Sequence, residues 1–576
     1  MGTLLFRRGK YSLLNCLMLT VLLLLHMITY AGAVEEKTLK VVDPAYKATN
    51  VVPGTPLRGS NGMNFDDEGN LLVGHVNNSR ISKININTGE IFTLIDFERG
   101  VTGADDLTSD GKGTIWTSSC IGIGGESVFK IDKQGKVTML YSGLPGVNGI
   151  QYNRRTGRLF MGQYSLGNGL YEIDPNGAKP PRLITKEFAY TNAMDFDKDN
   201  NILLTIPGGK IARVNSATGE SKILEVSFPH NSALKVGPNG EIYVTGYKDH
   251  FGEVWKVSPD GKTSESLSSG KIAALDNLAV SKDNRLFVSS LRDATIYEVA
   301  TDGSGKTRIL APTGPSTIIY MGAKGNDIYT ADGLLIRKLN EEKGTLELTK
   351  GSFYERKGFP LPGSLLGGPA DSMYMATGHF INNQFDARVY TFDTKDFTFR
   401  KINKGLYQGL KTPMGFCVKE NTLYVPEFVS GEVTAIDAGD DEAKRKTVGR
   451  MLVGPIGVVE KDNKLYVAES LGQRITVIDL ESGHQDVLLT GLIGRPTAIA
   501  LDKEGNLLIV DANGKRLLKV NPINGQIWVI AKDLPIYPNI SSNWPLIGLP
   551  NGLAVTENGA IYIGGNDDGS VWKIVK

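Results

Sequence analysis

Short runs of apolar residues alternate with polar turn signals along most of the chain. Residues 275–280 are apolar apart from Asp276 and Asn277, residues 281–285 are polar, and residues 286–288 are apolar again. This pattern predicts two strands joined by a hairpin turn. The first complete copy of the unit predicts four strands, at residues 62–65, 71–74, 81–84 and 91–94.

The same unit recurs along the chain at intervals of roughly 35–50 residues, which is typical of the four-stranded blades of a β-propeller. Further first strands are predicted around Leu107, Ile150, Met194, Leu234 and Leu278, and six more copies follow. Twelve blades exceed the usual range of about 4–8 in one ring. We therefore predict an all-β protein with two tandem six-bladed propellers, at residues 34–311 and 312–576, divided where Pro and Gly cluster near residues 311–315.

The N-terminal 33 residues have the pattern of a signal peptide. Three basic residues precede an apolar run over residues 13–28, and the small residues 31–33 follow as a cleavage site. The alternative is an uncleaved membrane anchor, because the run is close to the length of a spanning helix. We expect cleavage after Ala33, and hence a secreted or periplasmic protein with no membrane attachment.

Composition excludes some classes of function. The 576 residues carry a net charge of +1, which gives no electrostatic case for binding nucleic acid. After cleavage only Cys120 and Cys417 remain, one in each half, so a disulfide framework is not expected. No Cys/His spacing typical of zinc sites is present.

The strands at the two ends of the repeat do not match in number. The last copy ends at Lys576 without a fourth strand, while an extra strand is predicted at residues 38–42. Residues 38–42 could complete the sixth blade while residues 307–310 complete the twelfth. Alternatively, residues 38–42 reach the twelfth blade directly. We favour the first arrangement, because each propeller is then closed by neighbouring segments.

Oxygen-bearing residues precede the first strand of every blade in the N-terminal half. They are Asn61, Asp105 with Asp106, Asn148, Asn192, Ser232 with Asn231, and Asp276 with Asn277. In the C-terminal half the corresponding positions are mostly apolar or hydroxylic: Thr317, a position near Ser364, Met414, Ile456, Thr497 and Asn551.

Converging carboxylate and amide oxygens are the ligands that Ca²⁺ prefers. Asn and Asp also suit the turn before a strand, but that explanation predicts equal enrichment in both halves. We therefore predict one Ca²⁺ at the mouth of the first propeller, with ligands among Asp105, Asp106, Asn148, Asn192, Asn231, Asp276 and Asn277.

The segments Asn61-Gly62-Met63, Asn148-Gly149-Ile150 and Asp276-Asn277-Leu278 resemble those of calcium-dependent six-bladed propellers of the SMP-30/gluconolactonase and paraoxonase type, which include strictosidine-synthase-like members. The resemblance covers about residues 38–311. It implies metal ligands at Asp105 or Asp106, Asn192, Asn231 or Ser232, and Asp276. The acid is Asp where those families usually have Glu, and it comes one blade later. The C-terminal half is similar to generic NHL-type repeats.

A Ca²⁺ ion in such a site would polarise an ester, lactone or phosphoryl oxygen, and Asp276 would activate water. His75, His230 and His250 are expected near the mouth as candidate proton shuttles, each with a solvated loop histidine as the alternative. Three functions compete: a lactonase- or esterase-type hydrolase acting on a small molecule; a lyase, cyclase or isomerase; and a binding propeller with structural Ca²⁺. We expect the second propeller to be a protein-binding or stabilising module.

Overall fold

The computed structural model describes most of the chain after residue 37. The described residues are 38–76, 79–96, 99–119, 126–164, 167–188, 191–248, 251–268, 272, 275–290, 295–311, 320–331, 336–349, 361–381, 384–396, 398–401, 413–437, 445–536 and 552–576. All named elements within these ranges are β-strands in antiparallel sheets, which confirms the predicted all-β class. Within the same ranges no helix is long and apolar enough to span a bilayer. The signal segment 1–33 and Cys120 lie outside the described residues.

Six four-stranded sheets, called the N-terminal sheets below, follow one another between residues 60 and 309. Their strands, four to a sheet, are β3 (Ser60–Phe65), β4 (Leu71–His75), β5 (Arg80–Ile84), β6 (Ile91–Ile95); β7 (Ala104–Ser109), β8 (Ile115–Ser119), β9 (Ser127–Ile131), β10 (Val137–Ser142); β11 (Val147–Asn153), β12 (Arg158–Gln163), β13 (Leu170–Ile173), β14 (Arg182–Thr185); β15 (Met194–Phe196), β16 (Ile202–Ile206), β17 (Lys210–Val214), β18 (Ser221–Ile223); β19 (Asn231–Val236), β20 (Ile242–Lys248), β21 (Phe251–Val257), β22 (Ser264–Ser266); β23 (Leu275–Val280), β24 (Leu286–Ser290), β25 (Ile296–Val299) and β26 (Thr307–Ile309).

The C-terminal sheets follow the same plan. Their strands are β27 (Tyr320–Lys324), β28 (Asp327–Ala331), β29 (Ile336–Asn340), β30 (Thr345–Leu348); β31 (Leu361–Gly367), β32 (Ser372–Ile381), β33 (Gln384–Asp393), β34 (Phe399–Lys401); β35 (Cys417–Lys419), β36 (Thr422–Glu427), β37 (Glu432–Asp437), β38 (Arg445–Gly449); β39 (Pro455–Lys461), β40 (Lys464–Glu469), β41 (Arg474–Asp479), β42 (Gln485–Thr490); β43 (Pro496–Leu501), β44 (Leu507–Asp511), β45 (Arg516–Val520), β46 (Ile527–Lys532); β47 (Gly552–Val555), β48 (Ile561–Gly564) and β49 (Val571–Val575), joined by β1 (Lys40–Val41) and β2 (Lys47–Val52).

In each sheet, the strand that comes first in the chain is called the inner strand, and β1 and β2 are left out of this definition. In the N-terminal sheets the inner strands contact one another in chain order from β3 to β23, and β23 contacts β3. The sheets pack face to face through apolar side chains, as where Met63 and Val73 of the first sheet meet Phe287 and Ile296 of the sixth. In the C-terminal sheets β27 contacts both β31 and β47. In the N-terminal sheets this stacking is circular and lets neighbouring sheets cover one another's faces, which is the principle of a β-propeller.

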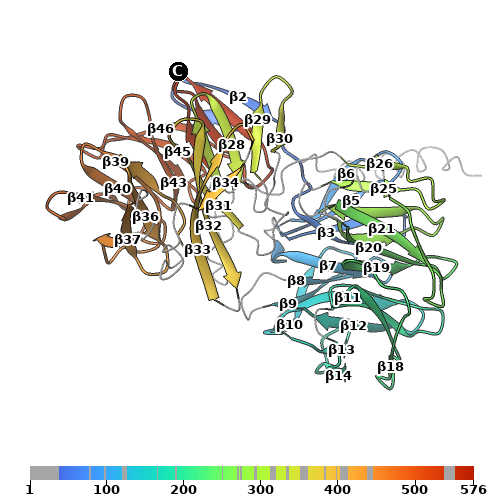
Figure 1. Cartoon of the computed structure of the whole chain (residues 1–576). Helices are drawn as coiled ribbons and strands as arrows, with labels where there is room; N and C mark the ends of the chain where they lie inside the picture. The colour runs from blue at the N-terminus through green and yellow to red at the C-terminus, as the bar shows by residue number, and fades with distance from the viewer. Residues whose placement is uncertain are drawn as a thin grey trace, which may run out of the picture. The chain divides into compact units, whose positions relative to one another are not determined.

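The two N-terminal strands belong to the C-terminal sheets. β1 pairs with β46, with Lys40 opposite Lys532, and β2 pairs with β49, with Lys47 opposite Val575. Figure 1 shows β2, in blue, beside the red C-terminal strands. β26 pairs with β25 and so completes the sixth sheet.

The favoured closure, with residues 38–42 in the sixth blade and residues 307–310 in the twelfth, is therefore wrong. The sixth sheet already has four strands of its own, whereas the twelfth has three. The alternative is right that the start of the chain completes the twelfth sheet, but it assigned that role to the wrong strand. Residues 47–52 complete the twelfth sheet, while residues 40–41 add a fifth strand to the eleventh.

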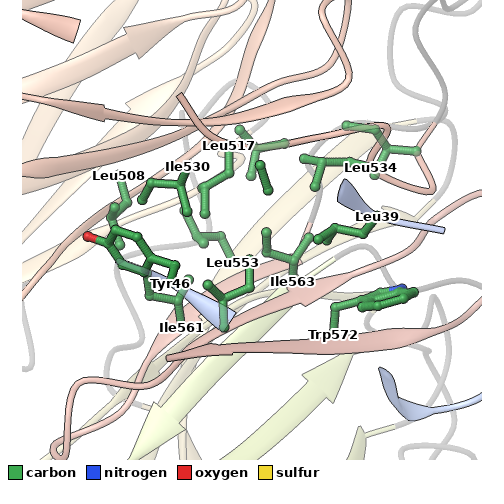
Figure 2. Packing of buried hydrophobic residues seen from close by; sticks show 14 of the residues in the cluster. Leu39, Tyr46, Leu508, Leu517, Ile530, Leu534, Leu553, Ile561, Ile563 and Trp572 are labelled. Atoms are coloured by element: carbon green, nitrogen blue, oxygen red, sulfur yellow. The ribbon is translucent and has the colours of Figure 1, made fainter. Parts of the chain in front are cut away.

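Apolar side chains fix these N-terminal strands in place. Leu39 and Tyr46 are buried in a cluster with side chains of the eleventh and twelfth sheets. Figure 2 shows both residues among Leu508, Ile530 and Leu553. Fully burying one large apolar side chain contributes about 1.5–3 kcal/mol, so the strands are anchored by packing as well as by hydrogen bonds.

Candidate polar site of the N-terminal sheets

A β-bulge near the start of the inner strands defines equivalent positions. The pairing register shifts between Ser60 and Met63, Ala104 and Leu107, Val147 and Ile150, Asn231 and Ala233, and Leu275 and Leu278. Aligning the pairs gives three rows. The mouth row is Asn61, Asp105, Asn148, Asn192, Ser232 and Asp276; the bulge row is Gly62, Asp106, Gly149, Ala193, Ala233 and Asn277; and the inner row is Asn64, Thr108, Gln151, Asp195, Lys235 and Ala279.

Side chains of the mouth row meet across neighbouring inner strands. The Nδ2 of Asn148 donates to Oδ2 of Asp105 over 2.7 Å, and the Nδ2 of Asn192 donates to the backbone oxygen of Ser232 over 2.9 Å. Asp105 is buried, while Asn148, Asn192 and Asp276 are half-buried. The row therefore brings Asp105 and Asn148 into direct contact, as the sequence column predicts.

Asn231 lies outside the mouth row. It precedes Ser232, and its Nδ2 donates to the backbone oxygen of Lys210 over 2.6 Å, at the start of β17. Ser232 occupies the row position instead, as the strict alignment of the sequence indicates. Asn231 is therefore held by the neighbouring sheet rather than grouped with Asp105 and Asn148.

Asp106 is buried in the bulge row and fully engaged. Its Oδ1 accepts the N–H of Leu107 over 2.9 Å, and its Oδ2 accepts the N–H of Ile150 over 3.0 Å. The side chain of Asn277 also donates to it. These contacts tie the second, third and sixth sheets together around one carboxylate. Asp106 and Asn277, predicted as mouth ligands, thus form a buried hydrogen-bonded pair.

Gly62 lies in the bulge row between the strands that carry Asp106 and Asn277. A Cβ at Gly62 would lie 2.5 Å from the backbone oxygen of Asp105 and 2.7 Å from Oδ1 of Asp106. Both approaches are closer than non-bonded atoms allow. Glycine at this position therefore leaves the space in which Asp106 is held.

The inner row forms a second polar layer. The Nζ of Lys235 is buried and donates to Oε1 of Gln151 over 2.9 Å. Gln151 in turn donates through Nε2 to Oδ1 of Asp195 over 3.4 Å, and Oδ2 of Asp195 accepts the N–H of Val236 over 2.8 Å. Three consecutive sheets are linked by this layer.

Lys235 also acts on the buried carboxyl group of Asp106. Burial raises the pKa of Asp106 above its usual value, and the positive charge of Lys235 acts in the opposite direction. The net shift is upward, so burial outweighs the effect of Lys235 and favours the neutral form of Asp106. A positive charge from the protein itself thus acts on this carboxyl group, without an ion pair between the two side chains.

The histidines do not match the predicted role equally. His75 is fully buried; its Nε2 lies 2.9 Å from Oγ of Ser82, and its Nδ1 accepts the N–H of Arg58 over 3.3 Å. Burial, with the charges of Arg80 and Arg58, lowers its pKa from 6.5 to about 3. His75 is therefore a neutral core residue at pH 7, and the expectation that it faces the mouth is wrong. His230 is exposed and burial of part of its ring lowers its pKa, while His250 lies outside the described residues.

The mouth row contains oxygen ligands that suit Ca²⁺, but fewer of them than we predicted from the sequence. Asp105, Asn148, Asn192 and Asp276 remain, and the two amides use their nitrogen atoms on protein acceptors, which leaves their oxygen atoms for another partner. No group of three or more His, Cys, Asp or Glu side chains suited to a metal occurs among the described residues. Because Ca²⁺ takes about six to eight oxygens, these residues fit a site that backbone or water oxygens complete.

The inner row was not predicted from the sequence. Lys235, Gln151 and Asp195 each lie three residues after the mouth row, and Asn64 and Thr108 occupy the same position in the first two sheets. The signal was present in the aligned repeats, because five of the six N-terminal inner strands carry a polar residue there.

Comparisons with known proteins give likeness of fold only. No protein-family model and no curated protein matches the sequence. Among solved structures, a GH74 enzyme from Niastella koreensis aligns over 91% of this chain and 99% of its own, with 11% identity and a TM-score of 0.43. The extracellular domain of a putative one-component system from B. thetaiotaomicron aligns over 92% and 77%, with 13% identity and a TM-score of 0.30. The tricorn protease aligns over 83% of this chain at 14% identity and a TM-score of 0.35, and the chain spans about half of its length.

Proposed function

We propose that the chain is an exported protein of two tandem six-bladed β-propellers, and that the N-terminal propeller binds one Ca²⁺ at its mouth row. The six N-terminal sheets, with their inner strands in a closed circuit, support the blade count. The resemblance to SMP-30/gluconolactonase- and paraoxonase-type propellers supports the metal. The bound ion would supply Lewis-acid polarisation of a carbonyl oxygen, so the reaction proposed is hydrolysis of a lactone or ester.

One observation carries the proposal. Asp105 and Asp276 stand at equivalent positions of the second and sixth inner strands, and Asn148 is bonded to Asp105 over 2.7 Å. In this arrangement Asn148 orients the Asp105 carboxylate, and we assign to Asp276 the role of taking a proton from water. Asp106 is held deeper in the sheets by the N–H groups of Leu107 and Ile150, so the proposed cation site uses the mouth carboxylates Asp105 and Asp276.

A binding propeller with a structural cation is the second candidate. The observation that favours it is the burial of His75, which removes one of the three predicted proton shuttles from the mouth. Lyase, cyclase or isomerase chemistry on the same scaffold is distinguished from hydrolysis by product analysis.

Calcium titration of the purified protein tests the site. Asp276→Asn removes one charge and keeps the side-chain shape, so we expect Ca²⁺ affinity by isothermal titration calorimetry to fall at least tenfold. Asn231→Ala is the matched control, because that amide bonds to Lys210. Equal affinity of wild-type protein and Asp276→Asn would refute the metal site.

Activity assays then separate the two candidates. We expect hydrolysis of a panel of lactones and aryl esters that chelation abolishes and added Ca²⁺ restores. Calcium binding without turnover of any panel member would favour the binding propeller. Turnover without incorporation of labelled water would favour a lyase or isomerase.

A further inference from the structure

The inner strands of the C-terminal sheets surround a cavity of about 700 Å³. All six inner strands contribute to its lining, including Gly322, Leu366, Val459 and Ala554. Its volume falls within the range of about 300–1,000 Å³ that is usual for small-molecule sites. The Ca²⁺ site proposed above lies on different strands, so this cavity is a separate feature.

The cavity exists because the inner row changes character in these sheets. Aligning the strand pairs gives the inner row of the C-terminal sheets. It consists of Gly322, Leu366, Cys417, Val459, Ala500 and Ala554. None of the six carries a charge or an amide, and all six line the cavity. Small and apolar residues stand where the N-terminal sheets hold the network of Lys235.

Two hydroxyl groups in the lining are poorly paired. The Oγ of Ser364 is buried and has no hydrogen-bond partner among the described residues. Among the described residues, the hydroxyl of Tyr320 donates to the sulfur of Met414 over 3.9 Å. Sulfur is a weak acceptor. Tyr320 and Ser364 occupy equivalent bulge-row positions on β27 and β31, which contact each other. A buried polar group without a partner is costly, so a ligand oxygen that accepts from these hydroxyl groups would be bound favourably.

The charges around the cavity restrict the ligand. Among the described lining residues the acids are Glu420 and Glu460, and none is a lysine, arginine or histidine. Glu460 is paired with Lys419, which lies outside the lining, over 3.1 Å. An anionic ligand would find no cation in the described lining, and burying a charge in apolar surroundings is costly.

We propose that the cavity binds a neutral, largely apolar small molecule that carries a hydroxyl or carbonyl oxygen. The apolar walls bury its hydrocarbon part, and Tyr320 and Ser364 bind its oxygen. Water alone would fill the space poorly, because about twenty molecules at about 30 Å³ each would face walls with few polar partners.

A displacement titration tests the ligand class. The purified chain is titrated with N-phenyl-1-naphthylamine, a neutral fluorescent probe, which is then displaced with 1-dodecanol or with dodecanoate. We expect saturable binding of one probe per chain and displacement by dodecanol at least tenfold better than by dodecanoate. Absence of saturable binding, or equal displacement by the carboxylate, overturns the proposal.

Variants locate the binding in the cavity. Ala500→Phe fills it and should weaken probe binding at least tenfold, whereas Met451→Phe, at a side chain that is 89% exposed, should not. Ala554→Val is a smaller filling change for use if Ala500→Phe does not fold, and its circular dichroism should match the parent. Ser364→Ala should reduce the affinity for dodecanol several-fold and leave that for the probe unchanged. Wild-type binding by both filling variants would place the probe elsewhere and contradict the proposal.

Discussion

The two sets of sheets are built on one plan but differ at their inner rows. In the N-terminal sheets this row holds a buried lysine, a glutamine and an aspartate in a continuous hydrogen-bonded network, next to the buried carboxylate of Asp106. In the C-terminal sheets the same row is apolar or small and borders a cavity of about 700 Å³. The same position of one repeat therefore carries a polar network in one set of sheets and an apolar cavity wall in the other.

Closure also differs between the two sets. The N-terminal sheets are completed by their own strands, whereas the eleventh and twelfth sheets receive β1 and β2 from the start of the chain. The two differences suggest four experiments, which run from the largest expected effect to the smallest.

Removing residues 38–52 should damage only the C-terminal sheets. The truncation takes away the strand partners of β46 and β49 and the buried side chains of Leu39, Tyr46 and Val52. At about 1.5–3 kcal/mol for each such side chain, the loss is a large part of the stability of one domain. Hydrogen exchange measured by mass spectrometry should show lost protection in residues 496–576 and native protection in residues 60–309. Greater loss in residues 60–309 would contradict the strand pairing.

Lys235→Met should destabilise the N-terminal sheets by about 1–3 kcal/mol, because it leaves buried Gln151 without its donor and removes a positive charge that acts on Asp106. Chemical unfolding followed by tryptophan fluorescence measures the change. The double variant Lys235→Met/Asp106→Asn should recover part of the loss, since the amide carries no charge for Lys235 to act on. Additive losses in the double variant would show that the two side chains do not interact.

His75 should make stability depend on pH. Its pKa in the folded protein, about 3, lies below the usual 6.5, so the unfolded chain binds a proton between these values and the folded chain does not. Stability is therefore fully present above pH 6.5 and falls as the pH decreases towards 3, by up to about 1.4 kcal/mol per pH unit. The slope between pH 6.5 and 4 should decrease in His75→Gln and persist in His484→Gln, whose side chain is exposed. An unchanged slope in His75→Gln would show that His75 titrates normally.

A matched pair in the bulge row should give the smallest effects. Asn277→Ala removes a donor to buried Asp106 and should cost about 1–3 kcal/mol. Ser364→Ala, at the equivalent position of the C-terminal sheets, removes a hydroxyl that lacks a partner among the described residues and should change stability by less than about 0.5 kcal/mol. Equal losses of stability in the two variants would mean that the bulge rows of the N-terminal and C-terminal sheets do not differ energetically.

The sequence predicted the repeating strands and the location of the inner strands well, because apolar runs and turn residues are local signals. Ser60–Phe65 and Leu71–His75, for example, form strands where the pattern places them. It also predicted that Asp105 and Asn148 share a row. It did not predict that residues 47–52 pair with the C-terminal strand, because a strand's own pattern does not specify a distant partner.

The burial of single polar residues was equally hard to predict. Lys235 in a strand is expected to face solvent, and only its hydrogen bonds to Gln151 and to the backbone oxygen of Met194 explain its burial. His75 is the last residue of an apolar strand and could have faced solvent, but packing places it in the core. Such outcomes depend on contacts between sheets that are far apart in the sequence.

The pairing of β2 with β49 has a consequence for how the protein folds. Lys47 and Val575 are partners although nearly the whole chain separates them, so this contact has a very high sequence separation. Contacts of that kind form slowly, because a long loop must close before they give any energy. During synthesis the N-terminal sheets have all their strands early, while β1 and β2 wait for partners made last. We expect the docking of these two strands to be the final, rate-limiting step of folding, and the exposed edge of β2 to be the point at which aggregation competes with it.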